Sequence, residues 1–163
     1  MVVDSIRQIL KNREFVNIAT CDFAGHPNAA AKFLLKFEDH CFYLIDHSFG
    51  RTMSNLKINP KASLSFVNLE TLTGYQVNGD VEIIPEGPEF EKITSELRKK
   101  QVTLSVDRII AGISKGSRKS KKFQKRYEVE MPEKFVVLKV KAEEVIEVGP
   151  CGRIKRYNPK DIL

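Results

Sequence analysis

The stretch NAAAKFLLKF, residues 28–37, decides the fold that we expect for this chain. Its residues alternate in character with a period of two, which is typical of a β-strand because successive side chains point to opposite faces. On this pattern Phe33 points one way, whereas Lys32, Leu34 and Lys36 point the other way. Two lysines on one face indicate either a solvated surface or a cationic wall that faces an anionic ligand.

Similar patterns before and after this stretch predict further strands, separated by turn residues. The expected strands are residues 15–21, 28–37, 41–45, 61–68, 74–84 and 134–142. The expected helices are one that begins at Asp4 or Ser5 and three that cover residues 51–58, 88–101 and 106–113. Closely spaced strands with short turns predict a mainly β protein with flanking helices (α+β), folded as an antiparallel barrel or sandwich.

Composition and length favour a single soluble domain. The chain has 163 residues, and neither an internal repeat nor a long linker divides it. Its apolar runs are too short to span a membrane, and its first residues lack the features of a secretory signal. Cys21, Cys41 and Cys151 lie far apart in the sequence, which predicts free thiols in a reducing cytoplasm.

A candidate phosphate site lies at the start of the helix expected at residues 51–58. The net charge of +6 favours anionic partners in general. A helix start offers free backbone N–H groups and a positive dipole end, and both suit a phosphate. Gly50 allows close approach, Arg51 can bind two phosphate oxygens, and Thr52 can donate its hydroxyl.

Several short motifs around this site occur in a characteristic order. They are Gly25-His26-Pro27-Asn28, Phe42-Tyr43, Gly50-Arg51-Thr52, Asn55-Leu56, Asn59-Pro60 and Tyr75-Gln76-Val77-Asn78-Gly79-Asp80-Val81-Glu82. The ordered set resembles the pyridoxamine 5′-phosphate oxidase-like FMN-binding split barrels over about residues 2–85. Residues 135–148 are similar to the last barrel strand of that family.

This resemblance implies a fold, a cofactor and an assembly. The fold would be one FMN-binding split antiparallel β-barrel over residues 1–163, with a helical basic insertion at about 86–131. The protein would be a homodimer with FMN at the interface. It would pass electrons between a reduced nicotinamide or deazaflavin and a small acceptor molecule. No catalytic residue is nominated, because a flavin carries the hydride chemistry itself.

The resemblance also implies which residues hold the phosphate of FMN. Arg51 and Thr52 would bind it, although Thr52 stands where the family usually has a lysine. Lys32 or Lys36 would then replace the missing charge from the neighbouring strand. The arginine that opens this strand in the oxidase is Ala31 here.

The remaining cofactor contacts follow from the same resemblance. Phe33 and Leu34 would line the isoalloxazine ring, partly through backbone groups, and Gln76 resembles a glutamine that often reaches a flavin from the neighbouring subunit. Asn55 lies one helical turn from Arg51 and would brace the loop, and Gly50 and His47 flank the phosphate.

Two alternatives and two exclusions remain. The barrel could be a carrier or sensor for flavin or haem, with His47 or another turn histidine as an axial ligand of the haem. The basic run at residues 115–126, followed by Tyr127, could bind nucleic acid, which we consider the weaker alternative. The histidines match no metal site. Arg153 and Arg156 lack the surrounding pattern of true pyridoxamine phosphate oxidases, so oxidation of vitamin B6 is not expected.

Overall fold

The chain forms two compact units. A computed structural model describes residues 2–11, 13–114 and 132–159. The first unit combines Met1–Pro85 with Phe135–Leu163, and the second is Glu86–Lys134. Each unit is described by itself below.

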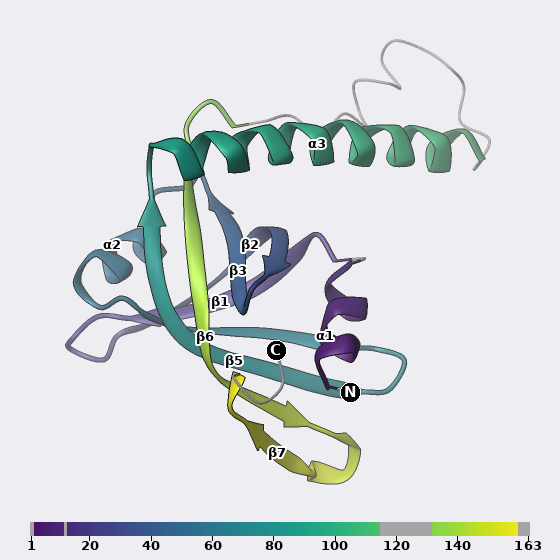
Figure 1. Cartoon of the computed structure of the whole chain (residues 1–163). Coiled ribbons are helices and arrows are strands. Elements are labelled where there is room, and N and C mark those ends of the chain that lie inside the picture. Colours follow the sequence, from purple (N-terminus) through teal and green to yellow (C-terminus); the bar gives the residue numbers. More distant parts are fainter. Residues whose placement is uncertain (1, 12, 115–131, 160–163) are drawn as a thin grey trace. The chain divides into compact units, whose positions relative to one another are not determined.

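Among the described residues, every strand belongs to the first unit, together with the α-helices α1 and α2 (Figure 1). Its elements are α1 (Val2–Lys11), β1 (Phe15–Cys21), β2 (Pro27–Glu38), β3 (Cys41–Asp46), α2 (Arg51–Ile58), β4 (Lys61–Asn68), β5 (Thr73–Ile84), β6 (Val136–Val148), η1 (Pro150–Gly152) and β7 (Ile154–Tyr157). The six longer strands confirm the expected mainly β fold. The short strand β7 was not expected. It has only four residues after Gly149-Pro150, and the two basic ones in the middle hide any alternation of apolar and polar side chains.

The strands form a closed antiparallel barrel. The order in the sheet is β3-β2-β1-β4-β5-β6-β7, and an additional pairing of β3 with β6 closes a ring of the first six. The register of this closure runs from Cys41 opposite Lys141 to Asp46 opposite Val136. β7 pairs with β6 outside the ring. The choice between barrel and sandwich that the sequence left open is therefore decided for the barrel.

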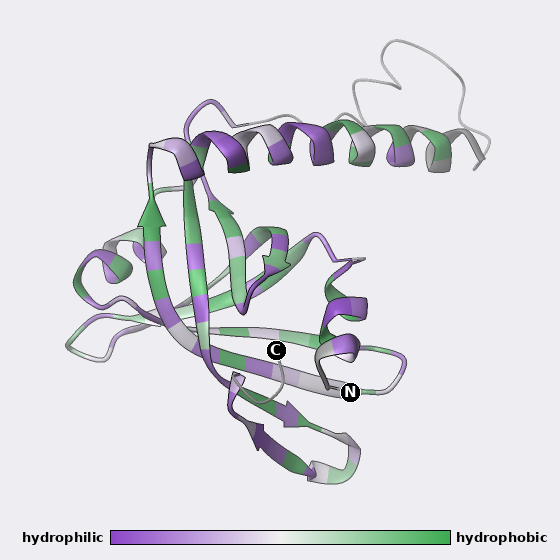
Figure 2. Cartoon of the chain, viewed as in Figure 1, coloured by the Kyte–Doolittle hydropathy of each residue, from purple (hydrophilic) through white to green (hydrophobic). Residues whose placement is uncertain are grey.

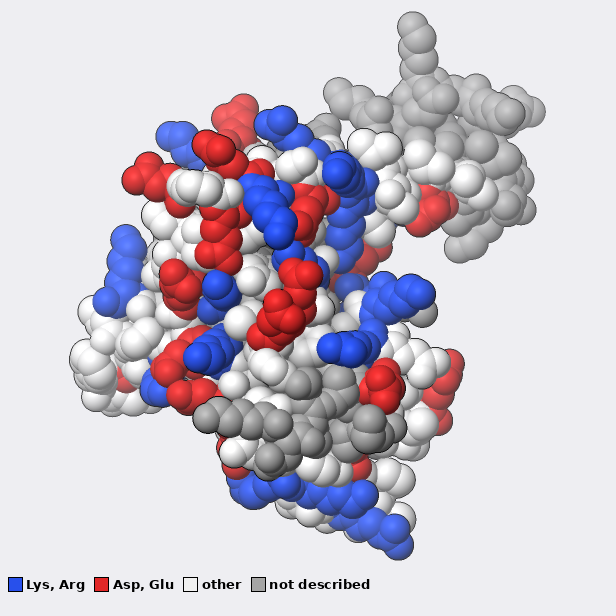
Figure 3. All heavy atoms as spheres, viewed as in Figure 1, with Lys and Arg blue, Asp and Glu red and all other residues white. Residues whose placement is uncertain are grey.

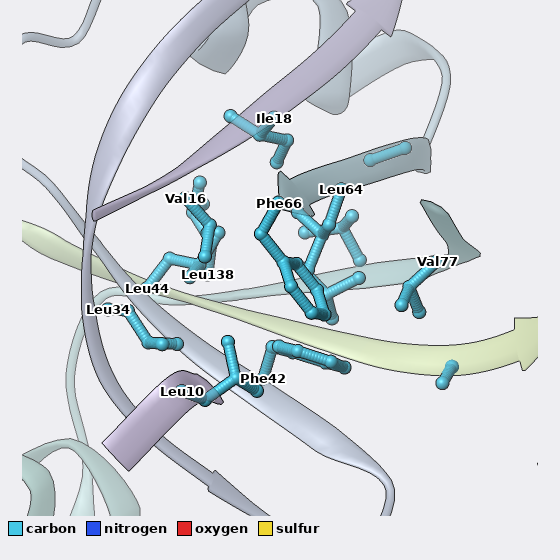
Figure 4. Packing of buried hydrophobic residues seen from close by; sticks show 14 of the residues in the cluster. Leu10, Val16, Ile18, Leu34, Phe42, Leu44, Leu64, Phe66, Val77 and Leu138 are labelled. Atoms are coloured by element: carbon cyan, nitrogen blue, oxygen red, sulfur yellow. The ribbon is translucent and has the colours of Figure 1, made fainter. Parts of the chain in front are cut away.

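The core fills the inside of the ring with one side chain in two from each strand. Alternating colours along β5 and β6 in Figure 2 show this pattern, whereas β3 is buried along its whole length. Figure 4 shows Val16, Leu34, Phe42, Leu64 and Leu138, which come from five different strands and converge inside the barrel. Each of these side chains is at most 3% exposed. Such burial of large apolar side chains is the main source of stability in a fold of this size.

Both helices of the first unit pack on the barrel. Ile6 and Leu10, one helical turn apart in α1, join the buried core cluster, as the sequence predicts for this helix. In α2 the inward residues Met53 and Leu56 are also buried in this cluster. The expected bounds of α2, residues 51–58, are those of the structure.

A β-bulge in β2 corrects the expected orientation of its lysines. Leu34 pairs with Leu44 and Lys36 pairs with Tyr43, so Leu35 is the extra residue between them. Before the bulge Lys32 and Leu34 point inward, and after it Phe37 packs against the core while Lys36 points outward. The expectation that Lys32 and Lys36 share a face is wrong, because one inserted residue exchanges the two faces of a strand.

In the second unit, the residues that the structure describes form one long helix, α3 (Pro88–Ser114). The sequence predicts two helices here, at residues 88–101 and 106–113, but the structure continues the helix between them. No proline or glycine interrupts residues 102–105, so nothing in the backbone requires a break. The basic run at residues 115–126 lies outside the described residues. None of the helices in the described ranges is long and apolar enough to cross a membrane.

A second bulge explains the glycine at position 79. Glu143 is the extra residue in β6, between the pairs Gly79–Ala142 and Asn78–Glu144. A Cβ atom on Gly79 would lie 2.0 Å from the backbone oxygen of Lys141. Only a residue without a side chain therefore allows this close approach of β5 and β6.

We predict that Gly79→Ala destabilises the barrel by about 1–3 kcal/mol, the usual range for forcing extra atoms into a packed site. Urea unfolding would measure the change in free energy. Gly74→Ala is the matched control on the same strand, since its Cβ would meet ordinary contacts at 3.8 Å or more. Equal stability of the two variants would contradict this explanation of the bulge.

Candidate functional site

The loop between β3 and α2 presents a set of hydrogen-bond donors. Phe49 lies in the left-handed region with φ of 47°, and Gly50 follows as the N-cap residue of α2. No side chain caps this helix start, so its first backbone N–H groups lack the usual side-chain acceptor. Arg51 is exposed beside them. This donor set suits an anion, as the sequence predicts.

The side chains of Thr52 and Asn55 face the barrel. Thr52 is 3% exposed, and its Oγ1 accepts a hydrogen bond of 2.9 Å from Asn28 Nδ2. Asn55 is 5% exposed, and its Nδ2 donates to Thr20 Oγ1 at 3.2 Å. These bonds fix α2 on strands β1 and β2. They leave the backbone and Arg51, rather than the Thr52 hydroxyl, as the outward groups of this helix start.

Lys32 forms a buried ion pair with Asp46. Its Nζ lies 2.8 Å from Asp46 Oδ1, and the two side chains are 8% and 0% exposed. The same Nζ donates to Ser48 Oγ at 2.9 Å. Asp46 Oδ1 also accepts the backbone N–H of Ser48 at 3.0 Å and its hydroxyl at 2.9 Å. Lys32 therefore does not form part of the predicted cationic wall, because its charge is buried and neutralised by Asp46.

The charge state of Asp46 follows from these contacts. Burial alone raises the pKa of a carboxyl group, but the hydrogen bonds from Lys32 and Ser48 outweigh it, so the pKa of Asp46 lies below its ordinary value. Asp46 is therefore a carboxylate at neutral pH. Its second oxygen, Oδ2, is buried and has no hydrogen-bond partner in the described part of the chain.

Lys36 belongs to a different surface. Its Nζ lies 2.8 Å from Glu38 Oε2 and 4.9 Å from the centre of the Tyr43 ring. Lys139 Nζ lies 5.8 Å from the centre of the same ring. Tyr43 is opposite both lysines in the sheet, which places this cationic and aromatic group on the outside of the barrel.

Phe33 and Leu34 point to opposite faces of β2. Phe33 packs edge to face with Phe15 on the outer surface, with 5.7 Å between ring centres. Leu34 is 1% exposed in the core, and its backbone N–H donates to Glu14 O at 2.8 Å. Phe33 is thus the member of this pair whose side chain is directed away from the core.

Gln76 belongs to a polar ladder across β5, β6 and β7. Gln76 Nε2 donates to Asn78 Oδ1 at 3.0 Å, and Asn78 Nδ2 donates to Glu144 Oε2 at 2.8 Å. Arg156 Nη1 completes the ladder at 2.8 Å from Glu144 Oε1. The hydrogen bonds from Asn78 and Arg156 lower the pKa of Glu144. Arg156 is therefore engaged within its own chain.

An open groove lies beside Arg51. It has a volume of about 690 Å³ and is lined by Asp22, His26, Arg51, Ser54, Asn55 and Ile58. His26 Nδ1 lies 2.8 Å from Asp22 Oδ2, and the hydrogen bonds from His26 lower the pKa of Asp22. His47 is exposed in the loop before Arg51. His40 differs from both, because its Nδ1 is buried and lacks a hydrogen-bond partner among the described residues.

Sequence reasoning missed two groups at this site. Asp46 was read as the start of a polar loop, yet it is fully buried at the end of β3. Asp22 and His26 were read as turn residues only. The sequence does indicate that Asp46 points inward, because it follows Phe42 and Leu44 at a spacing of two residues and these two side chains lie in the core. No sequence signal shows that Lys32 is its partner, because that depends on the pairing of β2 with β3.

Comparisons with known proteins agree on the fold. A family model described as "Pyridoxamine 5′-phosphate oxidase" matches residues 2–149. A search of curated proteins found no match. Several solved structures are similar at less than 25% identity, which shows a common fold and no more.

Three of these structures illustrate the range. A protein related to general stress protein 26, of the pyridoxinephosphate oxidase family, from Clostridium acetobutylicum is 17% identical with a TM-score of 0.68, over 99% of this chain and 96% of that one. A pyridoxamine 5′-phosphate oxidase-related, FMN-binding protein from Nostoc punctiforme is 11% identical with a TM-score of 0.55, over 96% and 94%. A heme-binding protein from Mycobacterium smegmatis is 19% identical with a TM-score of 0.63, over 98% and 59%.

The family match covers most of the chain, and the barrel topology agrees with it. The expected resemblance is thereby confirmed: this chain belongs to the pyridoxamine 5′-phosphate oxidase-like split-barrel family.

Proposed function

We propose that this protein is an FMN-binding oxidoreductase that acts on a small molecule. The observation that carries the proposal is the uncapped start of α2, where exposed Arg51 and free backbone donors lie together in a chain of this family. The FMN-binding protein from Nostoc punctiforme has the same fold and supports the choice of cofactor. When bound, FMN would supply the hydride and electron transfer.

The donor set fits the phosphate of FMN. Arg51 and the first N–H groups of α2 would hold it, and Gly50 leaves open space, since a Cβ there would meet nothing closer than 4.0 Å. Lys36 is not assigned to the phosphate, because it lies on a different surface of the barrel and pairs there with Glu38. Phe33 and Gln76 also lie on outward faces of the barrel and would contact the ring system.

We do not extend the proposal to vitamin B6 or to nucleic acid. Arg156 is paired with Glu144, so this C-terminal arginine is already engaged within its own chain.

The surface of the described residues in Figure 3 intersperses Lys and Arg with Asp and Glu, with a basic group over the β6–β7 hairpin. Arg153, Lys155 and Arg156 are exposed in that hairpin. Among the described residues this mixture gives no broad basic face in the view shown, and the basic run at residues 115–126 lies outside them.

The outer barrel surface supports a homodimer. Phe15 and Val67 are 51% and 43% exposed on adjacent strands, beside Phe33. Asn17, opposite Ala31 and Ser65, continues this face with small side chains. A partly apolar exposed sheet face of this kind is a typical contact between identical subunits. We infer that two copies pair here and that FMN binds at their interface.

The cytoplasm is the compartment that we propose. Cys21, Cys41 and Cys151 are all free thiols in the structure, and one of them is exposed. An exposed free thiol is more compatible with a reducing compartment than with an oxidising one.

Haem is the second candidate ligand. The heme-binding protein from Mycobacterium smegmatis has this fold, and exposed His47 beside the phosphate loop could serve as an axial ligand. In that case the protein would be a carrier or sensor rather than a flavin enzyme.

We predict that Arg51→Ala weakens FMN binding by about 1.5–3 kcal/mol, roughly ten- to more than a hundredfold in Kd, because a charge-assisted hydrogen bond to the phosphate is lost. Calorimetric titration would measure the affinity. Lys57→Ala, at the other end of α2, is the control and should leave Kd unchanged. An Arg51 variant with wild-type affinity would show that the phosphate lies elsewhere.

A haem titration separates the two ligands. The flavin proposal predicts no specific shift of the haem Soret band on adding the wild-type protein. A shift that His47→Ala abolishes would instead support the haem alternative and count against FMN as the natural ligand.

We predict that Phe15→Asp converts the dimer into a monomer, because a charge would be buried in the apolar contact between subunits. Light scattering after size-exclusion chromatography would give the mass. Phe23→Asp, at an exposed turn, is the matched control and should remain dimeric. A wild-type protein that is monomeric at every concentration would contradict the proposed interface.

A further inference from the structure

The buried charges at the end of β3 form a closed set of contacts. Asp46 Oδ1 lies within 3.0 Å of Lys32 Nζ, Ser48 N and Ser48 Oγ, and Lys32 Nζ also reaches Ser48 Oγ. Three segments meet in these bonds: strand β2, strand β3 and the loop that leads to α2. The loop residue Ser48 is held by both its backbone and its side chain.

This arrangement is costly for the barrel. Desolvating two charges consumes most of the gain from their attraction, and a buried pair is often no more stabilising than apolar residues of similar size. Asp46 Oδ2 adds to the cost, because it is buried without a partner. The pair is therefore explained poorly by stability and better by the geometry that it imposes on Ser48.

The backbone after Ser48 needs such a constraint. Phe49, the next residue, has φ of 47°, which is an unfavourable conformation for a bulky side chain. Phe49 is 48% exposed, so packing around its ring does little to hold it in place. The hydrogen bonds of Ser48 with Lys32 and Asp46 fix the loop directly before Gly50 and Arg51.

We propose that Lys32 and Asp46 are positioning residues that set the loop at residues 47–50 and so present the start of α2 to the phosphate of FMN. The inference rests on the proposed function. It also changes the role of Lys32, which acts through Asp46 and Ser48 instead of touching the phosphate. With its charge balanced by Asp46 and its side chain 8% exposed, Lys32 adds no net charge to the site.

The direction in which one mutation changes the affinity for FMN distinguishes a positioning role of Lys32 from direct contact with the phosphate. Asp46→Ala removes a negative charge near the phosphate site and releases the charge of Lys32. If Lys32 contacted the phosphate, FMN would bind more tightly to this variant. If the pair positions the loop, FMN binds about 10- to 100-fold more weakly, the range known for losing a group that orients the direct ligands of a metal ion.

Riboflavin provides the internal comparison, because it lacks the phosphate. We expect Asp46→Ala, Lys32→Met and Ser48→Ala to weaken FMN binding while riboflavin affinity stays unchanged. Lys61→Met removes the exposed ion pairs with Asp80 and Glu143 and should change neither affinity. Equal losses for both flavins would mean a general disturbance of the barrel and would overturn the proposal, as would tighter FMN binding by Asp46→Ala.

Hydrogen exchange tests the loop without any ligand. In Lys32→Met the amide of Ser48, which donates to Asp46 Oδ1, should exchange faster than in the wild type, while those of β1 and β4 keep their protection. Unchanged exchange in the loop would overturn the proposal even if FMN binds. If the wild type binds neither flavin, the proposed function fails, and with it the role toward phosphate; the exchange data then show separately whether the ion pair fixes the loop.

Discussion

The pairing of β3 with β6 is the contact on which the rest of the structure depends. It turns a row of strands into a ring, so that each of the six barrel strands has a neighbour on both sides. A closed ring leaves no exposed edge among these strands and separates an apolar interior from an outer surface. It also fixes the end of β3, from which the loop to α2 departs. The candidate phosphate site is therefore held by the barrel rather than by a free loop.

Two bulges adjust this ring, and they mark the limit of prediction from sequence. Alternation along residues 28–37 predicted the strand, but Leu35 exchanges its faces halfway and sends Lys32 inward and Lys36 outward. A bulge inserts one residue without leaving a composition signal, so a period of two cannot show it. The sequence does give a partial signal for the bulge in β6. Gly79 on the partner strand β5 has no side chain, and the close approach of the two strands at the bulge requires such a residue.

The same distinction applies to the site. The position of α2 and its exposed Arg51 followed from local signals: a polar loop, a glycine and an apolar stripe at helical spacing. The inward side chains of Thr52 and Asn55 required knowledge of how α2 packs on β1 and β2. The ion pair of Lys32 with Asp46 joins residues on two strands, and sequence alone carries no record of their register. Contacts within one element were thus predictable, whereas contacts between elements were not.

The central claim is that this barrel binds FMN through the start of α2, and the visible absorption spectrum of the purified protein tests it most directly. We predict the bands of a bound flavin, present on purification or appearing with stoichiometric uptake when FMN is added. A protein that stays colourless, and from which added FMN is removed completely by desalting, would contradict the claim.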